Sequence, residues 1–322
     1  LAYTTDNTGF RQYTLHVKNL LTGETLASLA ERVGSVAWAA GNRTLFYSVE
    51  DEETKRPYQI LRRTLDAEKQ IFSAVELVWQ DEDERFNVGV GRTRDGKFLI
   101  VEAASHTTSE QWFLAANNPT GALRCIEPRR DNIEYSADHR DGVFFIRVND
   151  TGRNFRLVSG NVEDVVAKGH NHWLEILPHR DDVMLEDVDL FQNFFVSCER
   201  FQGLPRLRIH TLAGQGTLAE QAQESPREIS FPEPTYTATP GANREFNATS
   251  YRYGYTSLVT PGSVFQYDLA TSQSALLKQV EVPGGFDRAL YASERIYSTA
   301  QDGVQIPVSL VYRRDRFQRG KN

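Results

Sequence analysis

Features that would place this chain in several common protein classes are scarce. Its 322 residues include one methionine and two cysteines, and no apolar run approaches the roughly 18 residues of a membrane-spanning helix. Two cysteines, Cys125 and Cys198, are too few for a secreted disulfide scaffold. We therefore expect free thiols and a cytoplasmic protein. No signal peptide is visible, and because the chain begins in strand-like residues, we expect its true start to lie upstream.

Basic residues are also fewer than acidic residues. The formal net charge is −7, whereas nucleic-acid-binding proteins present a basic face, so no nucleic-acid partner is expected. Acidic residues form two runs, Glu50–Glu53 and Asp81–Glu84. Two interpretations stay open for them: solvated loops, or a negative field that attracts cationic ligands.

The residues that usually reveal a catalytic site are missing as well. No Gly-x-Ser-x-Gly occurs, and Gly34-Ser35 and Gly262-Ser263 lack the second spaced glycine. His170-Asn171-His172 and His179 form the tightest histidine group, and on a strand residues 170 and 172 would share a face. No cysteine pair or regular carboxylate spacing accompanies them, so we predict a polar loop, no metal and no cofactor. No spacing among the acids identifies a glycosidase pair.

What the sequence does contain is aromatic residues arranged in a repeat. Six stretches share one plan, in which an apolar or aromatic strand, a polar turn and a second alternating strand follow one another. Their first strands begin near residues 1, 45, 98, 143, 194 and 251, so the spacings are 44, 53, 45, 51 and 57. A propeller blade of four short strands needs about 40–50 residues. The sequence therefore predicts an all-β fold built of propeller blades.

The segments between these hairpins complete the picture. Ser35–Trp38 and Val88–Val90 read as further strands of the blades, and Asp95-Gly96 and Asp141-Gly142 as turns before opening strands. Residues 213–234 read as a long polar connection, in which 218–224 favours a loop over a helical turn. Residues 281–322 do not complete another hairpin repeat.

Several strings resemble the propeller of the oligopeptidase B group, within the prolyl oligopeptidase family of serine peptidases. They keep their order along nearly the whole chain, and the most telling one is Asp302–Tyr312. The others include Gln12–Leu15 with Asn19–Glu24, Val33–Ala39, Thr44–Tyr47 with Pro57–Gln59, Ala104–Glu110, Pro128–Ser136, Arg252–Ser257 and Leu277–Gly284.

The resemblance implies a seven-bladed propeller that caps an α/β-hydrolase domain. Residues 1–280 would be the propeller, incomplete at about six blades with the missing blade upstream, and 281–322 a linker and the first strands of the hydrolase domain. Such enzymes cleave short peptides, here after Arg or Lys, while the propeller excludes folded proteins. The implied partners are short basic peptides and the chain's own α/β-hydrolase domain, with no membrane partner.

The same resemblance assigns few site residues to this chain. The Ser, Asp and His of the triad would lie beyond Asn322, so no catalytic residue is expected here and the fragment alone is predicted to be inactive. Phe46 matches the family only through a short Phe-Tyr motif. It would either pack in the core or contact the substrate.

The alternative function is a non-enzymatic propeller that serves as a binding scaffold. The sequence has no Trp-Asp dipeptide and only one Gly-His, at Gly169-His170, so the signature of WD repeats is missing. A scaffold would also close its ring, whereas this chain leaves the repeat through residues 302–312. Both observations favour the peptidase.

Overall fold

The computed structural model describes residues 1–26, 29–66, 68–212, 215–224, 226–318 and 320. Parts of the ranges predicted above, including Gly214 and Asn322, lie outside these residues. The chain divides into two compact units, Leu1–Asp150 with Leu157–Leu174, and Thr151–Arg156 with Glu175–Asn322. Within the described residues, no helix has the length and apolar character needed to cross a membrane.

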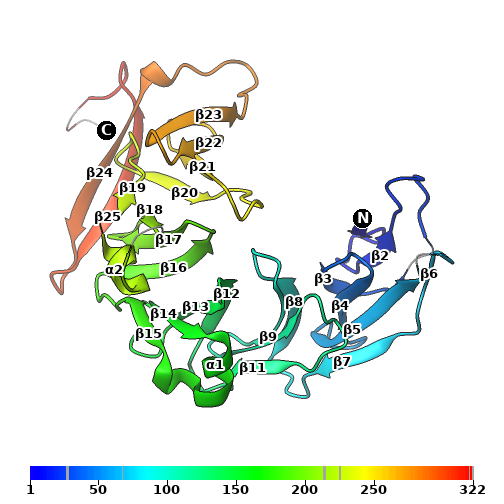
Figure 1. Cartoon of the computed structure of the whole chain (residues 1–322). Helices are drawn as coiled ribbons and strands as arrows, with labels where there is room; N and C mark the ends of the chain where they lie inside the picture. Colours follow the sequence, from blue (N-terminus) through cyan, green and yellow to red (C-terminus); the bar gives the residue numbers. More distant parts are fainter. Residues whose placement is uncertain (27–28, 67, 213–214, 225, 319, 321–322) are drawn as a thin grey trace. The chain divides into compact units, whose positions relative to one another are not determined.

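Antiparallel sheets account for most of the first unit (Figure 1). The sheets have the strand orders β1-β2, β3-β4-β5-β6 with β7 also paired to β5, β8-β9-β10-β11, and β12-β13-β14-β15, of which β15 lies mostly in the second unit. Their bounds are β1 Ala2–Thr5, β2 Thr14–Val17, β3 Val33–Trp38, β4 Thr44–Glu50, β5 Pro57–Asp66, β6 Ile71–Phe72, β7 Glu76–Gln80, β8 Asn87–Arg92, β9 Phe98–Ala104, β10 Ser109–Ala115, β11 Arg124–Glu127, β12 Tyr135–Arg140, β13 Val143–Val148, β14 Arg156–Asn161 and β15 Leu174–Leu177. Helix α1 (Val162–Lys168) and the 3-10 helix η1 (Gly169–His172) join β14 to β15.

The second unit continues the same plan and ends in a separate hairpin. Its sheets have the orders β16-β17-β18-β19, β20-β21-β22-β23 and β24-β25. The bounds are β16 Val183–Leu190, β17 Phe194–Phe201, β18 Leu204–Thr211, α2 Leu218–Gln223, β19 Arg227–Glu228, β20 Tyr236–Pro240, β21 Ser250–Ser257, β22 Ser263–Asp268, β23 Gln273–Gln279, the 3-10 helix η2 Arg288–Leu290, β24 Tyr291–Thr299 and β25 Gln305–Arg313.

Five of the six predicted hairpins are the two middle strands of a sheet, and the first one is the two-stranded sheet β1-β2. The stretch near residue 98, for example, is β9, and its partner is β10, with Trp112 opposite Val101. The segments predicted to complete the blades are confirmed as β3 and β8, which pair on the outside of these hairpins. The Asp141-Gly142 turn is also confirmed: Asp141 at φ 50° and Gly142 at φ 81° join β12 to β13, as a primed hairpin turn requires.

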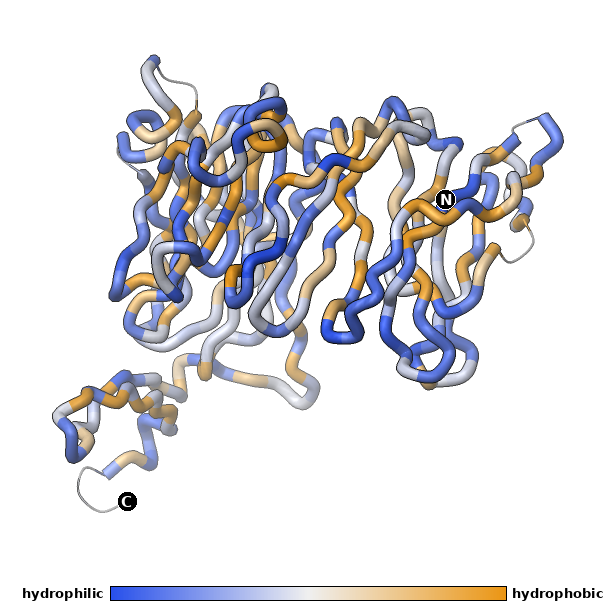
Figure 2. Tube along the Cα trace, turned by 90° about the horizontal axis from the view of Figure 1, so that it is seen from below, coloured by the Kyte–Doolittle hydropathy of each residue, from blue (hydrophilic) through white to orange (hydrophobic). Residues whose placement is uncertain are grey.

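Alternation along each strand supplies both faces of a sheet with apolar side chains. On β9, Leu99 and Val101 pack toward the sheet of β3–β5, while Ile100 packs toward the sheet of β12–β14. In the second unit, tyrosines of β21 such as Tyr251 and Tyr253 pack on Val196 and Ile209. Figure 2 shows the result as apolar residues along the strands and hydrophilic residues at the turns. Within each unit, the sheets are therefore stacked through period-2 apolar faces.

Two local expectations are wrong. Residues 218–223 are helical, because Thr217 and Glu220 form a capping box in which each side chain accepts from the other residue's backbone N–H. The histidines predicted in a polar loop, His170 and His172, lie in the short 3-10 helix η1 between α1 and β15. Residues 291–313 form a regular hairpin, β24-β25, in which Tyr297 lies opposite Pro307.

Candidate functional site

Phe46 was the one substrate-contact residue predicted from the sequence. It lies in β4, opposite Arg62 of β5, and has no exposed surface. Its side chain belongs to the apolar cluster that contains Ile60, Leu99 and Leu114. The side chain thus has a packing role in this chain, and contact with a substrate stays a prediction.

The acidic run Asp81–Glu84 is not uniformly solvated. The Asp81 side chain is only 5% exposed, and Arg129 Nη2 lies 2.6 Å from its Oδ2. The same guanidinium binds the buried Glu110 carboxylate at 2.8 Å and lies 3.9 Å from the centre of the Phe86 ring. Neither interpretation of the run holds for Asp81, whose charge is neutralised inside the first unit.

The other members of this run are held differently. Asp83 accepts hydrogen bonds from the Arg85 guanidinium and backbone N–H, which lower the pKa of its carboxyl to about 2. Glu82 is exposed and accepts from Gln80 Nε2 at 2.6 Å. Only part of the run, chiefly Glu82 and Glu84, remains available to create a field in solvent.

The cysteines and histidines fit structural roles. Both cysteines are free, as predicted, and burial next to Glu110 raises the pKa of the Cys125 thiol to about 12, which makes it a poor nucleophile. His170 Nδ1 lies 2.6 Å from Glu127 Oε1. No group of three or more metal-ligating side chains occurs within the described ranges.

A serine, a histidine and a glutamate meet in the second unit, which sequence spacing did not reveal. Ser197 Oγ lies 2.9 Å from both His210 Nε2 and Glu199 Oε1. His210 Nδ1 donates to the carbonyl of Ala222 in α2, at 2.6 Å. Ser197 has no exposed surface, and it lies on β17 rather than on the sharp turn that presents a nucleophile. The composition resembles a triad, but no substrate can reach this hydroxyl.

Desolvation controls the protonation of this buried group. Burial lowers the pKa of His210 to about 4, and Arg208 acts in the same direction. The Glu199 side chain is 1% exposed and binds Arg180 Nη2 at 2.7 Å. The arrangement is therefore a neutral imidazole beside an ion pair, and it ties α2 to β18.

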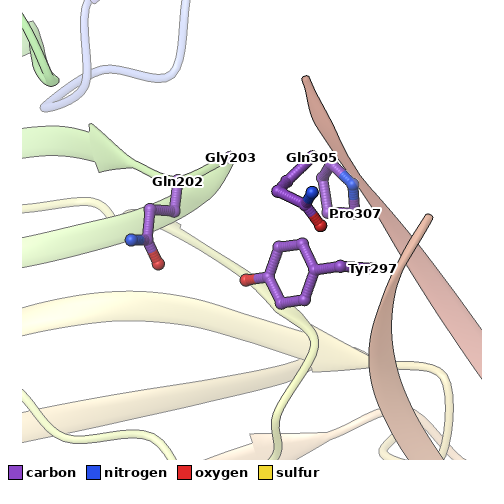
Figure 3. Close-up of a pocket in the computed structure, with 5 residues that line it drawn as sticks. All are labelled: Gln202, Gly203, Tyr297, Gln305 and Pro307. Atoms are coloured by element: carbon purple, nitrogen blue, oxygen red, sulfur yellow. The ribbon is translucent and has the colours of Figure 1, made fainter. Parts of the chain in front are cut away.

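A pocket lies where the β17–β18 turn faces the C-terminal hairpin, in the second unit. This pocket of about 630 Å³ is lined by Gln202, Gly203, Tyr297, Gln305 and Pro307. Figure 3 shows the Tyr297 hydroxyl pointing toward Gln202, with the Gln305 carboxamide beside the Tyr297 ring. None of these five described residues is charged. The volume of this pocket and its few converging polar groups are typical of a site that binds a small ligand or a peptide.

A second pocket, of about 520 Å³, lies at the start of the same hairpin. Its lining includes Glu233, Arg288 and Arg314. The Glu233 side chain is 5% exposed and is paired with Arg288, and it accepts from Thr260 Oγ1 at 2.6 Å. Together with the Thr235–Ser309 hydroxyl contact at 2.8 Å, this pair holds β24-β25 against the loops around residue 233.

Comparison with known proteins identifies this architecture. A family model described as the prolyl oligopeptidase N-terminal beta-propeller domain matches residues 1–280. The chain belongs to the prolyl oligopeptidase family. The predicted resemblance and the predicted propeller fold are both confirmed, and the four-stranded sheets are its blades.

Curated relatives cover the whole chain. It is 36% identical over 324 residues to dipeptidyl aminopeptidase BI of Pseudoxanthomonas mexicana, covering 100% of this chain and 42% of the relative. It is 27% identical over 315 residues to protease 2 of Moraxella lacunata, covering 97% and 43%. The chain thus spans less than half the length of these prolyl oligopeptidase family members.

Solved structures of the family agree. Oligopeptidase B of Leishmania major has a TM-score of 0.86 at 25% identity, covering 98% of this chain and 43% of that one. Oligopeptidase B of Trypanosoma brucei, in a closed form with covalently bound antipain, has a TM-score of 0.82 at 27% identity, covering 97% and 43%. The chain therefore corresponds to the propeller part of larger peptidases.

Proposed function

We propose that this chain is the substrate-gating propeller of a serine peptidase that hydrolyses short peptides after Arg or Lys. The observation that carries the proposal is the match to oligopeptidase B structures over nearly the whole chain. The strings quoted above, especially Asp302–Tyr312, support the same group within the family. A non-enzymatic scaffold is disfavoured, because the family consists of peptidases.

The chemistry would be supplied from outside this chain. Acyl transfer needs a nucleophile on an exposed sharp turn together with an orienting base. The sequence lacks the Gly-x-Ser-x-Gly pattern, and the buried Ser197 cannot replace it. This chain would contribute access control and partial binding surfaces, and its isolated form would not hydrolyse peptides.

We place the start of the catalytic domain at residues 281–322. The family model ends at residue 280, and β24-β25 forms a sheet separate from β20-β23. One face of this hairpin carries apolar side chains that are exposed, Ile296 at 45%, Ile306 at 48% and Leu310 at 36%. A covering domain would remove this apolar surface from water.

The proposal is tested with the full-length protein and fluorogenic peptides that differ only at the residue before the cleaved bond. We expect kcat/KM to be at least about tenfold higher for Arg and Lys than for Ala, since the charged pair is worth more than about 1.4 kcal/mol in a desolvated pocket. A serine-directed covalent inhibitor should abolish the activity. Equal rates for the three peptides would contradict the specificity, and turnover by the isolated 322-residue chain would contradict its role.

One relative favours a second candidate, the removal of dipeptides from the amino end of peptides. Dipeptidyl aminopeptidase BI is 36% identical to this chain over its full length. The two activities differ in their need for a free amino group. If acetylation of the substrate amino terminus abolishes cleavage, the second candidate holds; if acetylated peptides are cleaved equally well, the first does.

A further inference from the structure

The pocket in Figure 3 lies between the β17–β18 turn and the C-terminal hairpin, and the side chains of Gln202, Tyr297 and Gln305 point into it. Gln202 at φ 49° and Gly203 at φ 81° make the tight turn between β17 and β18, a conformation that favours glycine at the second position. Arg295 of β24 donates to the Gln202 carbonyl. A Cβ on Gly203 would lie 3.4 Å from the Arg295 guanidinium, so the turn and the hairpin approach each other closely.

The opposite wall comes from two adjacent cross-strand pairs of the C-terminal hairpin. Tyr297 lies opposite Pro307, and Thr299 lies opposite Gln305. Gln305 Nε2 donates to Thr299 Oγ1 at 2.8 Å, which orients the carboxamide and leaves its Oε1 as an acceptor. Tyr297 and Pro307 provide flat apolar surface between the polar groups.

The polar groups of the lining have unused hydrogen-bonding capacity. Within the described part of the chain, no side-chain partner occurs for the Gln202 carboxamide, the Tyr297 hydroxyl or Gln305 Oε1. Together these atoms offer donors and acceptors in alternation: a carboxamide has both, a phenol has both, and Oε1 accepts. None of the five lining residues that the structure describes carries a carboxylate for a metal. The guanidinium of Arg295, beside the pocket, binds the Gln202 carbonyl and lies 5.6 Å from the centre of the Tyr297 ring, so its charge is already engaged within the protein. The lining therefore favours an uncharged ligand that also alternates N–H and C=O groups.

A peptide main chain in extended form is the ligand with that chemistry. Its amide groups match glutamine carboxamides in donor and acceptor pattern, and small side chains would lie on the Tyr297 ring and Pro307. The volume of about 630 Å³ is within the usual range for sites that enclose a small ligand.

We propose that this pocket binds an extended, uncharged segment of a peptide through its main chain, at the junction of the propeller with the C-terminal hairpin. The site deepens the proposed function and rests on it for the identity of the ligand as a peptide. It provides binding energy away from the bond that is cleaved. It is insensitive to side-chain charge, so it adds affinity for peptide length rather than for sequence.

The test measures binding, separately from turnover, in the full-length protein after treatment with a serine-directed covalent inhibitor. The probe is a fluorescently labelled, acetylated tetra-alanine amide, followed by fluorescence polarisation and competed with the unlabelled peptide. Two variants remove polar atoms from the pocket, Gln305→Leu and Tyr297→Phe. The matched control is Gln273→Leu, at an exposed position of β23 outside the pocket.

We expect each pocket variant to weaken binding about three- to tenfold, the effect of one lost hydrogen bond, and the control to leave it unchanged. A tetra-alanine peptide with N-methylated amides should bind about tenfold or more weakly, because its donors are gone. Unchanged affinity in both variants, or equal binding of the N-methylated peptide, would overturn the proposal. Tyr297→Phe keeps the ring, so it remains informative if Gln305→Leu fails to fold. Because binding is read without turnover, a protein that binds tetra-alanine but cleaves nothing would contradict only the proposed activity.

Discussion

At the scale of single residues, Asp81 shows why charge in a sequence does not report solvation. It stands in a run of four acids, yet it is buried and paired with Arg129, which also binds Glu110 and lies over the Phe86 ring. Arg129 lies 48 residues away along the chain, so no local pattern could predict the contact. Its neighbour Glu82 has the same sequence character and is exposed.

Replacing Asp81 by Asn should therefore be costly. The substitution leaves Arg129 with one carboxylate in a partly desolvated site, and we expect the free energy of unfolding to fall by about 2 kcal/mol. Urea unfolding of the isolated chain measures this loss. Glu82→Gln is the matched control and should change stability by less than about 0.5 kcal/mol; equal effects of the two substitutions would show that Asp81 is not specially held.

His210 makes stability depend on pH in a defined direction. Its pKa is lowered from 6.5 to about 4 by burial, so the unfolded chain takes up a proton at a higher pH than the folded chain. The contribution of His210 is complete above pH 6.5 and is lost as pH falls toward 4, by up to about 3 kcal/mol. Burial raises the pKa of Asp138 from 3.8 to about 6. Asp138 therefore stabilises the folded state as the pH falls through this same range, in opposition to His210.

The measurement must therefore isolate His210. We expect the difference in unfolding free energy between the unaltered chain and His210→Gln to shrink as pH falls from 6.5 to 4, since Asp138 is common to both proteins. A difference that stays constant across this range would mean that the imidazole is not held neutral.

At the scale of elements, the sequence predicts the middle strands of the sheets but not the short helix α2 between β18 and β19. Period-2 alternation revealed the middle strands, such as β9 and β10, because each presents apolar side chains to both neighbouring sheets. The helix α2 was missed although its capping box, Thr217 to Glu220, is visible in the sequence. Six residues are too few for helical periodicity to register, so the cap was the available signal.

The C-terminal hairpin provides a prediction at this scale. If β24-β25 belongs to the catalytic domain, its exposed apolar face is covered in the full-length protein. Ile306→Ala and Leu310→Ala should then each cost about 2–4 kcal/mol there and less than about 1 kcal/mol in the 322-residue chain, where these side chains are 48% and 36% exposed.

Chemical denaturation of both proteins makes the comparison. Leu21→Ala is the control, since Leu21 is 97% exposed, and it should be neutral in each. Similar small losses in the two proteins would contradict the placement of the hairpin in the catalytic domain.

At the scale of the whole molecule, repetition identified the fold, whereas function came from family membership. The period at which apolar strands recur along the sequence matches the length of one blade, and this period alone is enough to predict the propeller. The pocket of Figure 3 could not be predicted in this way, because Gln202 and Tyr297 are 95 residues apart and neither belongs to a motif. Tertiary placement alone joins them.

The acidic surface gives a prediction for the full-length protein. With Asp81 neutralised internally, the exposed Glu82 and Glu84 remain to attract the basic peptides proposed as substrates. In the full-length protein, changing both to Gln should lower kcat/KM for basic peptides about two- to threefold at low salt, and the difference should vanish near about 0.5 M salt because exposed charges are screened. Curves that coincide at every salt concentration would show that these acids only solvate the loop.

The central claim is that this chain is a propeller that limits a peptidase to short substrates. The most direct measurement compares cleavage by the full-length protein of one Arg-containing peptide, free in solution and placed in an exposed loop of a stably folded protein. We predict cleavage of the free peptide and at least about a hundredfold lower kcat/KM for the loop, because the proposed gating by the propeller would exclude a folded protein. Equal cleavage of the two substrates would contradict the account.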